Sequence, residues 1–185
     1  IEYQHGLIAK SDIFYDFPIK LKKTKKDTLF CDLIRVYGEY WKNKLLEGNS
    51  YKKNQIEVLG YYQFNRQFPN QKEKEIIENF AGNKKIILVT SQTYLSSFYK
   101  KHILNLLDNL PNNYRIILKI HPNEDENIYN DLLFTNDLLI TLISLEVLFK
   151  YSSFHLTIYS TTVFDSIRFN VPTFLIYEEN FKEYI

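Results

Sequence analysis

The chain has 185 residues, a formal net charge of +1 and a hydrophobic fraction of 45%. This length suits one domain plus part of a second, and the balanced charge excludes a global electrostatic attraction to nucleic acid or membranes. No stretch reaches the roughly 20 apolar residues that span a bilayer, and the first residues do not read as a signal peptide. The single cysteine, Cys31, cannot form an internal disulfide, which fits a reducing compartment. We therefore expect a cytoplasmic protein with at most peripheral association with the inner membrane.

The first 82 residues are predicted to form the tail of one α/β domain. The chain contains no methionine and begins within a predicted strand, so we expect it to be part of a longer protein. A helix breaker at residues 81–83 places the domain boundary near Gly82. Strands are expected at 1–4, 29–36 and 55–59, and helices at 39–46 and 72–80.

A basic run occupies residues 20–26. It lacks the interleaved aromatic side chains that stack on nucleic-acid bases, so we interpret it as a solvated loop. Contact with anionic lipid or an anionic acceptor is the alternative.

From residue 83 onward, strands and helices alternate through short connections. Residues 85–90 form a continuous apolar run, as expected for a strand covered on both faces. Such strand–helix–strand units form right-handed crossovers, so the pattern predicts a doubly wound parallel sheet of Rossmann-like α/β type. The further strands are expected at 114–120, 138–142, 154–159 and 173–177, and the helices at 96–110, 125–133, 145–152 and 162–169.

Polar residues directly follow four of the predicted strands. Ligands of open parallel sheets bind beyond the carboxyl ends of the strands, so these residues are the candidates for function. The four clusters are Gln4-His5-Gly6, Ser91-Gln92-Thr93, His121-Pro122-Asn123 and Ser160-Thr161-Thr162.

The cluster at His121 has a defined geometry. Pro122 fixes its own φ and favours an extended conformation for His121, so the direction of the imidazole is restricted. A histidine held there can donate to a phosphate oxygen or act as an acid on a departing phosphate. The alternative is a turn histidine that only caps a neighbouring carbonyl.

The residues Ser160, Thr161 and Thr162 precede a predicted helix. Hydroxyls and free N–H groups at a helix start can bind an anion, although the same residue types also serve as ordinary N-caps. Asp165, one turn further on, is placed to reach a ribose hydroxyl or only to favour the helix dipole.

The other two clusters are less specific. Ser91 and Gln92 suit a loop near a phosphate or sugar, or simply a polar loop. His5 has the position of a general base at a strand end, and the alternative is an exposed histidine without a function. Gly6 would permit tight curvature or close approach of a ligand.

Together and in this order, the clusters resemble the GT-B glycosyltransferases that build bacterial surface polymers. They are similar to the sialyl- and polysialyltransferases, the capsule Kdo transferases and the CDP-glycerol glycerophosphotransferases. These families share a His-Pro pair after one strand of the C-terminal domain and a Ser/Thr pair after a later one, and some have a His-Gly in the N-terminal domain. The resemblance covers residues 4–172 and includes Leu59-Gly60-Tyr61 and the Val171-Pro172 that ends the last short helix. One departure is Asp165, where the familiar pattern has Glu.

The resemblance implies a role for each part of the chain. Residues 1–82 would be the end of the acceptor-side N-terminal domain with the linker, and residues 83–185 the donor-binding C-terminal domain. His121, in its pair with Pro122, would contact the donor phosphate together with Ser160, Thr161 and Thr162. Ser91 and Gln92 would line the donor pocket, Gly60 would lie in the loop between the domains, and His5 would face the cleft and deprotonate the acceptor hydroxyl.

The function expected from this resemblance is transfer of a sugar or polyol phosphate from a nucleotide-activated donor to a cell-surface glycan or lipid-linked acceptor. The donor would be CMP-, CDP- or UDP-linked, with no further cofactor, no metal and no nucleic-acid partner. One alternative is a non-hydrolysing UDP-sugar 2-epimerase, which would need several carboxylates and a further histidine in the cleft. The other is a non-catalytic Rossmann-like module that binds a nucleotide or a partner protein.

Overall fold

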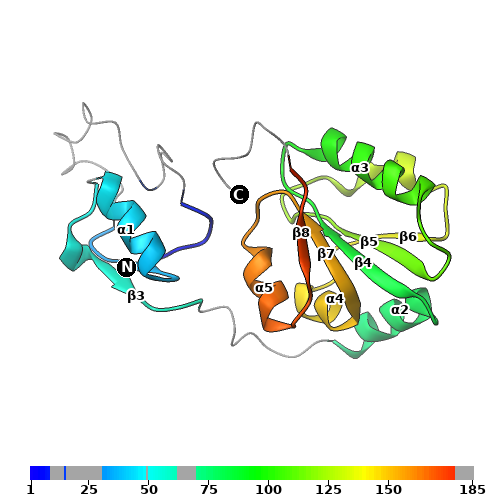
Figure 1. Cartoon of the computed structure of the whole chain (residues 1–185), viewed down its shortest axis with the longest axis horizontal. Coiled ribbons are helices and arrows are strands. Elements are labelled where there is room, and N and C mark those ends of the chain that lie inside the picture. The colour runs from blue at the N-terminus through cyan, green and yellow to red at the C-terminus, as the bar shows by residue number, and fades with distance from the viewer. Residues whose placement is uncertain (9–14, 16–30, 49, 62–69, 178–185) are drawn as a thin grey trace. The chain divides into compact units, whose positions relative to one another are not determined.

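The computed structural model describes residues 1–8, 15, 31–48, 50–61 and 70–177. The chain forms two compact units, which divide between residues 66 and 67. The first unit is blue and cyan in Figure 1, and the second runs from green to red. The basic run at residues 20–26 lies outside the described residues.

The first unit contains a parallel three-stranded sheet in the order β1-β2-β3. Helix α1 connects β2 to β3 and packs on both, and its Leu45 joins Ile34 and Ile56 in a common core. Of the strand predicted at 29–36, residues 34–36 are a strand, and residues 29 and 30 are not described. The elements are β1 (Glu2–Tyr3), β2 (Ile34–Val36), α1 (Glu39–Gly48), the 3-10 helix η2 (Lys53–Gln55) and β3 (Ile56–Val58).

The second unit is built on a five-stranded parallel sheet in the order β6-β5-β4-β7-β8. The chain thus starts in the central strand, builds outward in one direction and then returns to build in the other, which is doubly wound topology. The prediction of a Rossmann-like parallel α/β fold is confirmed. The strands are β4 (Lys85–Thr90), β5 (Tyr114–Lys119), β6 (Leu138–Thr141), β7 (Ser152–Thr157) and β8 (Thr173–Leu175).

Helices cover both faces of this sheet (Figure 1). Alternating residues of β5 face opposite layers: Ile116 and Leu118 pack with the layer of α3 and η4, whereas Ile117 packs with that of α2 and α4. Helix α5 contacts α4 on the second face. The helices are α2 (Gln71–Ala81), α3 (Ser96–Asp108), η4 (Glu126–Leu132), α4 (Leu145–Tyr151) and α5 (Thr162–Arg168).

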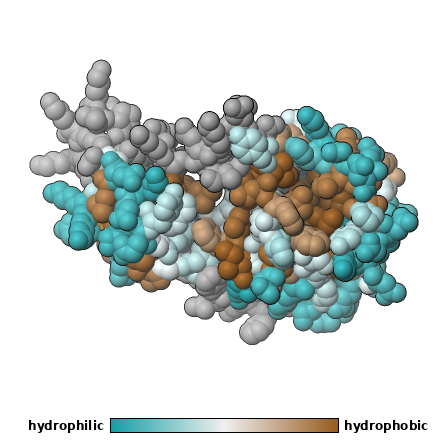
Figure 2. All heavy atoms as spheres, in the orientation of Figure 1, coloured by the Kyte–Doolittle hydropathy of each residue, from teal (hydrophilic) through white to brown (hydrophobic). Residues whose placement is uncertain are grey.

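Strand β8 lies at an edge of the sheet and exposes apolar side chains. Phe174 is 56% exposed and Tyr177 just beyond the strand is 66% exposed. Figure 2 shows apolar residues gathered over this edge. None of the helices in the described part of the chain has the length and hydropathy needed to cross a membrane.

Helix α2 belongs to the second unit. Its Ile77 is fully buried and packs with Ile86 and Leu148 of the second core. The division of the chain therefore lies before α2, whereas the sequence placed the boundary near Gly82. Gly82 has φ +54° and caps the C-terminus of α2, so the local break signal marks the end of a helix and not the end of a domain.

Helix α3 and strand β8 begin as predicted and end two residues earlier, and two other elements differ in type or position. The helix expected at 125–133 is the 3-10 helix η4. Strand β7 starts and ends two residues before the predicted 154–159. Ser152 is extended directly after α4, and beyond Thr157 the N–H of Ile158 bonds to the Tyr99 hydroxyl (3.3 Å) and not to a neighbouring strand.

Candidate functional site

The carboxyl ends of β4, β5 and β7 lie at the same end of the sheet because all three strands are parallel. We call this end the carboxyl edge, to distinguish it from the lateral edge formed by β8. His121 follows β5 and Thr161 follows β7, so both lie on this edge as predicted, with β4 between them. The ends of β5 and β7 are therefore separated by two strand spacings, roughly 10 Å. The strand order reverses between β4 and β7, and in open α/β sheets this switch point is where ligands bind.

The loop after β5 is held by the residue that follows β4. The backbone N–H of His121 donates to Oγ of the buried Ser91 (2.9 Å) and to Oε2 of Glu124 (3.2 Å). The Ser91 hydroxyl itself donates to the Glu124 carboxylate. The Glu124 N–H closes a turn onto the carbonyl of His121 (2.9 Å), and Pro122 takes the second position of that turn, which suits its fixed φ.

Glu124 is a residue that the sequence reasoning missed. Its carboxylate also accepts a hydrogen bond from the Tyr129 hydroxyl (3.0 Å), so it joins the ends of β4, β5 and the 3-10 helix η4. The available signal was its spacing, since a carboxylate three residues after a turn-opening residue can bond back to that residue's N–H.

The His121 ring is oriented by its own loop. Nδ1 accepts a hydrogen bond from the backbone N–H of Asn123 (3.1 Å). Because Nδ1 acts as the acceptor, the neutral ring carries its proton on Nε2 and can donate from that atom. His121 is therefore a turn histidine whose ring accepts from an N–H and does not cap a carbonyl as the alternative interpretation expected, and its Nε2 remains as a donor for a ligand.

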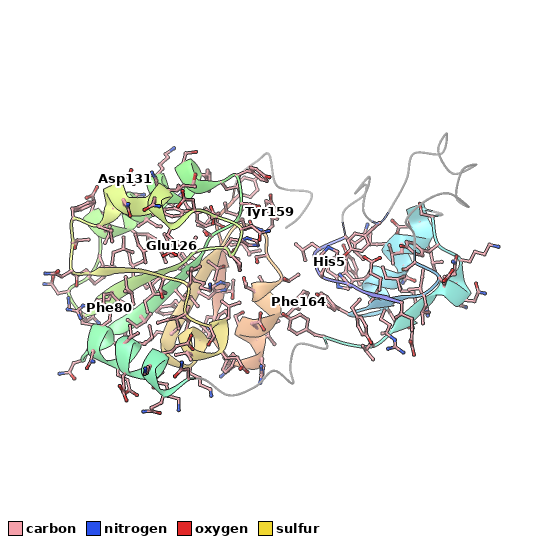
Figure 3. All side chains as sticks on the ribbon, turned by 180° about the vertical axis from the view of Figure 1, so that it is seen from behind. His5, Phe80, Glu126, Asp131, Tyr159 and Phe164 are labelled. Carbon is pink, nitrogen blue, oxygen red and sulfur yellow. The ribbon has the colours of Figure 1, made fainter. Side chains whose placement is uncertain are left out.

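Gln92 bridges the switch point between β4 and β7. Its Nε2 donates to the backbone carbonyl of Tyr159, which Figure 3 labels beyond the end of β7. This partner fixes the orientation of the amide, because a carbonyl accepts from Nε2 and cannot pair with Oε1. Within the described residues, the buried Oε1 has no hydrogen-bond partner. A ligand hydroxyl or N–H would satisfy this acceptor, whose desolvation otherwise costs about 1–3 kcal/mol.

The start of α5 has fewer free N–H donors than the sequence predicted. The N–H of Thr162 bonds to Ser160 Oγ (3.3 Å), and the N–H groups of Val163 and Phe164 bond to the carbonyls of Ser160 and Thr161 (3.3 and 3.0 Å). The expectation of free N–H groups is thus wrong for these three residues. Helix α5 has seven residues, so its dipole is short, and Asp165 lies in its first turn. The hydroxyls and N–H groups of Ser160 and Thr161 are the donors that remain at this helix start.

A buried histidine lies directly behind this site. His155 of β7 is fully buried, and its ring contacts Oγ1 of Thr90 through Nε2 (3.0 Å) and Oγ1 of Thr173 through Nδ1 (2.9 Å). Thr90 in turn contacts Thr162 Oγ1 (3.2 Å), and Thr173 donates to Ser166 Oγ (2.6 Å). This chain of polar groups ties both the start and the middle of α5 to the sheet.

Burial of the His155 ring lowers its pKa to about 3, so the ring is neutral at physiological pH. Sequence reasoning passed over His155 because it stands inside an apolar strand.

The candidates of the first unit lie apart from this group in the chain and belong to another core. Gln4 is buried and accepts from the N–H of Tyr37 (2.9 Å), which fixes the end of β1 against the end of β2. The side chain of His5 is 63% exposed, and its Nδ1 lies 3.2 Å from the Tyr15 hydroxyl. Its exposed position at the strand end is therefore as predicted.

The two candidate glycines differ. Gly60 has φ +88°, a conformation that favours glycine. The chain bends at Gly6, but Gly6 has no positive φ and a Cβ there would contact nothing within 4 Å, so this bend does not require glycine.

No group of three or more His, Cys, Asp or Glu side chains that could hold a metal ion occurs among the described residues. Four cationic side chains among the described residues of the second unit are paired with acids: Lys84 and Arg115 contact Asp137, Lys100 contacts Asp131, and Arg168 contacts Glu146.

Comparisons with known proteins establish the class of fold. No protein-family model matches the chain, and no curated protein matches it significantly. Several solved structures do. A variant of the wall teichoic acid polymerase TagF has a TM-score of 0.61 and 19% identity over 98% of this chain and 50% of that protein.

Two further solved structures share the fold. A co-structure of S. aureus MnaA with UDP has a TM-score of 0.58 and 16% identity over 80% of this chain and 44% of that chain. A glycosyltransferase from Rickettsia africae ESF-5 has a TM-score of 0.56 and 14% identity over 92% of this chain and 49% of that chain. The chain thus spans about half the length of these neighbours and has the Rossmann-like architecture of GT-B glycosyltransferases and epimerases.

Proposed function

We propose that this chain is part of a nucleotide-sugar-dependent glycosyltransferase and that the carboxyl edge of its second sheet binds the donor. The observation that carries the proposal is the fixed imidazole of His121. Its Nδ1 is engaged by Asn123 and its backbone by Ser91 and Glu124, so Nε2–H is a preorganised donor at the edge where ligands of such sheets bind.

The chemistry of sugar transfer suits this arrangement. Departure of a nucleotide leaves negative charge on its phosphate, and a donor aimed at that charge lowers the barrier. His121 would stabilise the leaving phosphate, with the hydroxyls of Ser160 and Thr161 as further contacts. The orphan Oε1 of Gln92 would accept from a donor group of the nucleotide or sugar. Asp165 is proposed to contact the ribose.

Transfer also requires a base for the acceptor hydroxyl. We assign that role to His5, which is exposed at the end of β1 in the first unit. The acceptor would be a glycan or lipid-linked glycan of the cell surface, and the moiety transferred a sugar or polyol phosphate.

A second candidate function is epimerisation of a UDP-sugar, because the solved neighbours with this fold also include UDP-N-acetylglucosamine 2-epimerase. The site favours transfer over epimerisation. Glu124, the carboxylate of the His121 loop, accepts from the Ser91 hydroxyl, the His121 N–H and the Tyr129 hydroxyl, so its oxygens are already occupied by donors of the protein. A nucleotide-binding module without catalysis is the remaining alternative.

A thermal-shift screen tests donor binding directly. Any ligand that binds only the folded protein raises the melting temperature by mass action. The shift in melting temperature should differ among CMP, CDP, UDP, GDP and their sugar conjugates, with one nucleotide giving the largest shift. Incubation of the full-length protein with the matching nucleotide-sugar then distinguishes the activities, since an epimerase converts the sugar without an acceptor and a transferase needs one. Absence of binding by every nucleotide would refute the proposal.

A further inference from the structure

Lys119 is a half-buried cation at the same edge of the sheet. It is the last residue of β5 and stands two positions before His121. Among the last residues of β4, β5, β6 and β7 and the three positions that follow each strand, all of them described, it is the only Lys or Arg.

The register of the sheet places Lys119 beside the residues already described. It pairs with Thr90 of β4, whose hydroxyl contacts Thr162 at the start of α5. Side chains of paired residues in a parallel sheet lie on the same face. Ile117, two positions earlier, packs on the layer of α2 and α4, so Lys119 also lies on that face, the face that α5 covers.

The ammonium group of Lys119 donates to the backbone carbonyl of Ile120 at 3.1 Å, its one hydrogen bond to the described residues. No carboxylate among the described residues lies within ion-pair distance of it. Glu73, the acid whose charge acts on it, is itself bonded to the N–H and hydroxyl of Ser144 (3.3 and 3.0 Å). An ammonium group has three donors, so most of the capacity of Lys119 is left for another partner.

Desolvation of this unpaired charge works against the folded protein. Burial lowers the pKa of the Lys119 ammonium, with the Glu73 charge acting in the opposite direction. A methionine of similar length would avoid this cost, so lysine at this position is better explained by a ligand than by packing.

We propose that Lys119 binds a phosphate group of the ligand and supplies the positive charge that a neutral His121 and the Ser160 and Thr161 hydroxyls lack. The inference rests on the proposed function and specifies the anionic part of its ligand. Lys119 would hold the phosphate from the α4 and α5 side of the sheet edge, and His121 from the loop after β5.

The test compares Lys119→Met and Lys119→Gln with the matched control Lys101→Met, an exposed lysine of α3. The affinity for the nucleotide selected in the screen is measured by calorimetry, and the stability of the free protein by thermal unfolding. We expect both Lys119 variants to be at least as stable as the wild type and to bind the nucleotide about tenfold more weakly or worse, since a charge-assisted hydrogen bond is lost. Lys101→Met should match the wild type in both measurements.

A structural role for Lys119 predicts the opposite pair of results, a less stable free protein with unchanged affinity, and this outcome would overturn the inference. Lys119→Gln keeps a donor for the Ile120 carbonyl, so it can be used for both measurements if the methionine variant does not fold. If the wild type binds no nucleotide, the proposed function fails, and titration with inorganic pyrophosphate still decides the role of Lys119. Equal binding of pyrophosphate by wild type and Lys119→Gln, or none by either, would refute it.

Discussion

The backbone N–H of His121 donates to the hydroxyl oxygen of Ser91 at 2.9 Å, which fastens the loop after β5 to the end of β4. Ser91 is 4% exposed and also donates to Glu124, so a single hydroxyl holds the loop through two bonds. Ser91→Ala should lower the free energy of unfolding by about 1–3 kcal/mol and weaken nucleotide binding, because buried partners are left unsatisfied and the loop that carries His121 is no longer fastened to β4. Denaturant unfolding and calorimetry measure the two effects. Ser97→Ala, on the exposed side of α3, is the control and should change neither.

Replacement of His121 with alanine should separate binding from folding. The substitution keeps the backbone bonds of the loop to Ser91 and Glu124 and removes only the exposed bond from the Asn123 N–H to the ring, so the melting temperature should stay close to that of the wild type. Nucleotide affinity should fall about tenfold, since one donor to a charged phosphate is removed. His102→Ala on α3 is the control. Wild-type affinity and turnover in a folded His121→Ala protein would mean that the His-Pro pair is only a turn.

The buried ring of His155 predicts an acid-sensitive fold. Its pKa is lowered to about 3 in the folded protein, whereas an unfolded histidine titrates near 6.5. The unfolded state therefore binds one more proton between these values, and stability is lost as the pH falls from 6.5 towards 3. The expected slope is about 1.4 kcal/mol per pH unit. Unfolding free energies measured at pH 7, 6 and 5 should show it.

His155→Gln is the matched variant for that experiment, because it keeps hydrogen-bonding groups and removes the titration. Its unfolding free energy should vary less with pH over the same range. An identical slope in the two proteins would show that other groups cause the acid sensitivity.

Tyr94 is predicted to be a strained position. It is 99% exposed, has φ +68° and occupies the third position of a turn closed by the Leu95 N–H and the Gln92 carbonyl (3.3 Å). The left-handed conformation costs a residue with a Cβ about 1–2 kcal/mol, and glycine avoids this at a smaller entropic cost. Tyr94→Gly should therefore stabilise the protein by about 0.5–1 kcal/mol in denaturant unfolding. Tyr94→Phe keeps the strain and should match the wild type; a loss of stability in the glycine variant would contradict the explanation.

The role proposed for His5 can be distinguished from that of His121 by kinetics. In the full-length, active protein, His5→Ala should lower kcat with little change in donor affinity, because a base acts mainly in the transition state. His121→Ala should impair donor affinity as well. The comparison needs initial rates and a separate measurement of donor binding. If His5→Ala retains the wild-type kcat, the base must come from another residue.

The sequence determined the order and type of most elements. The apolar run at β4 and the helical spacing in α3 are local patterns, and both elements begin at the predicted residue. The strand-end rule also placed Ser91, His121 and Thr162 on one edge, because it follows from parallel strands alone. Predictions from local patterns were least accurate where one sequence signal is compatible with two structures, such as a helix end and a domain boundary. Gly82 ends a helix inside the second unit, whereas the same helix-breaking signal in the sequence predicts a domain boundary.

Only the tertiary structure decided which partners those residues contact. His155 contacts Thr90 across 65 positions of the chain, and the His121 N–H meets Ser91 across 30. No local periodicity specifies contacts at such distances, since they depend on which strands become neighbours in the sheet. The same neighbours leave the Gln92 Oε1 without a partner and desolvate Lys119. The sequence therefore identified the edge that carries the candidate site, and packing decided which of its polar groups are already used and which are left for a ligand.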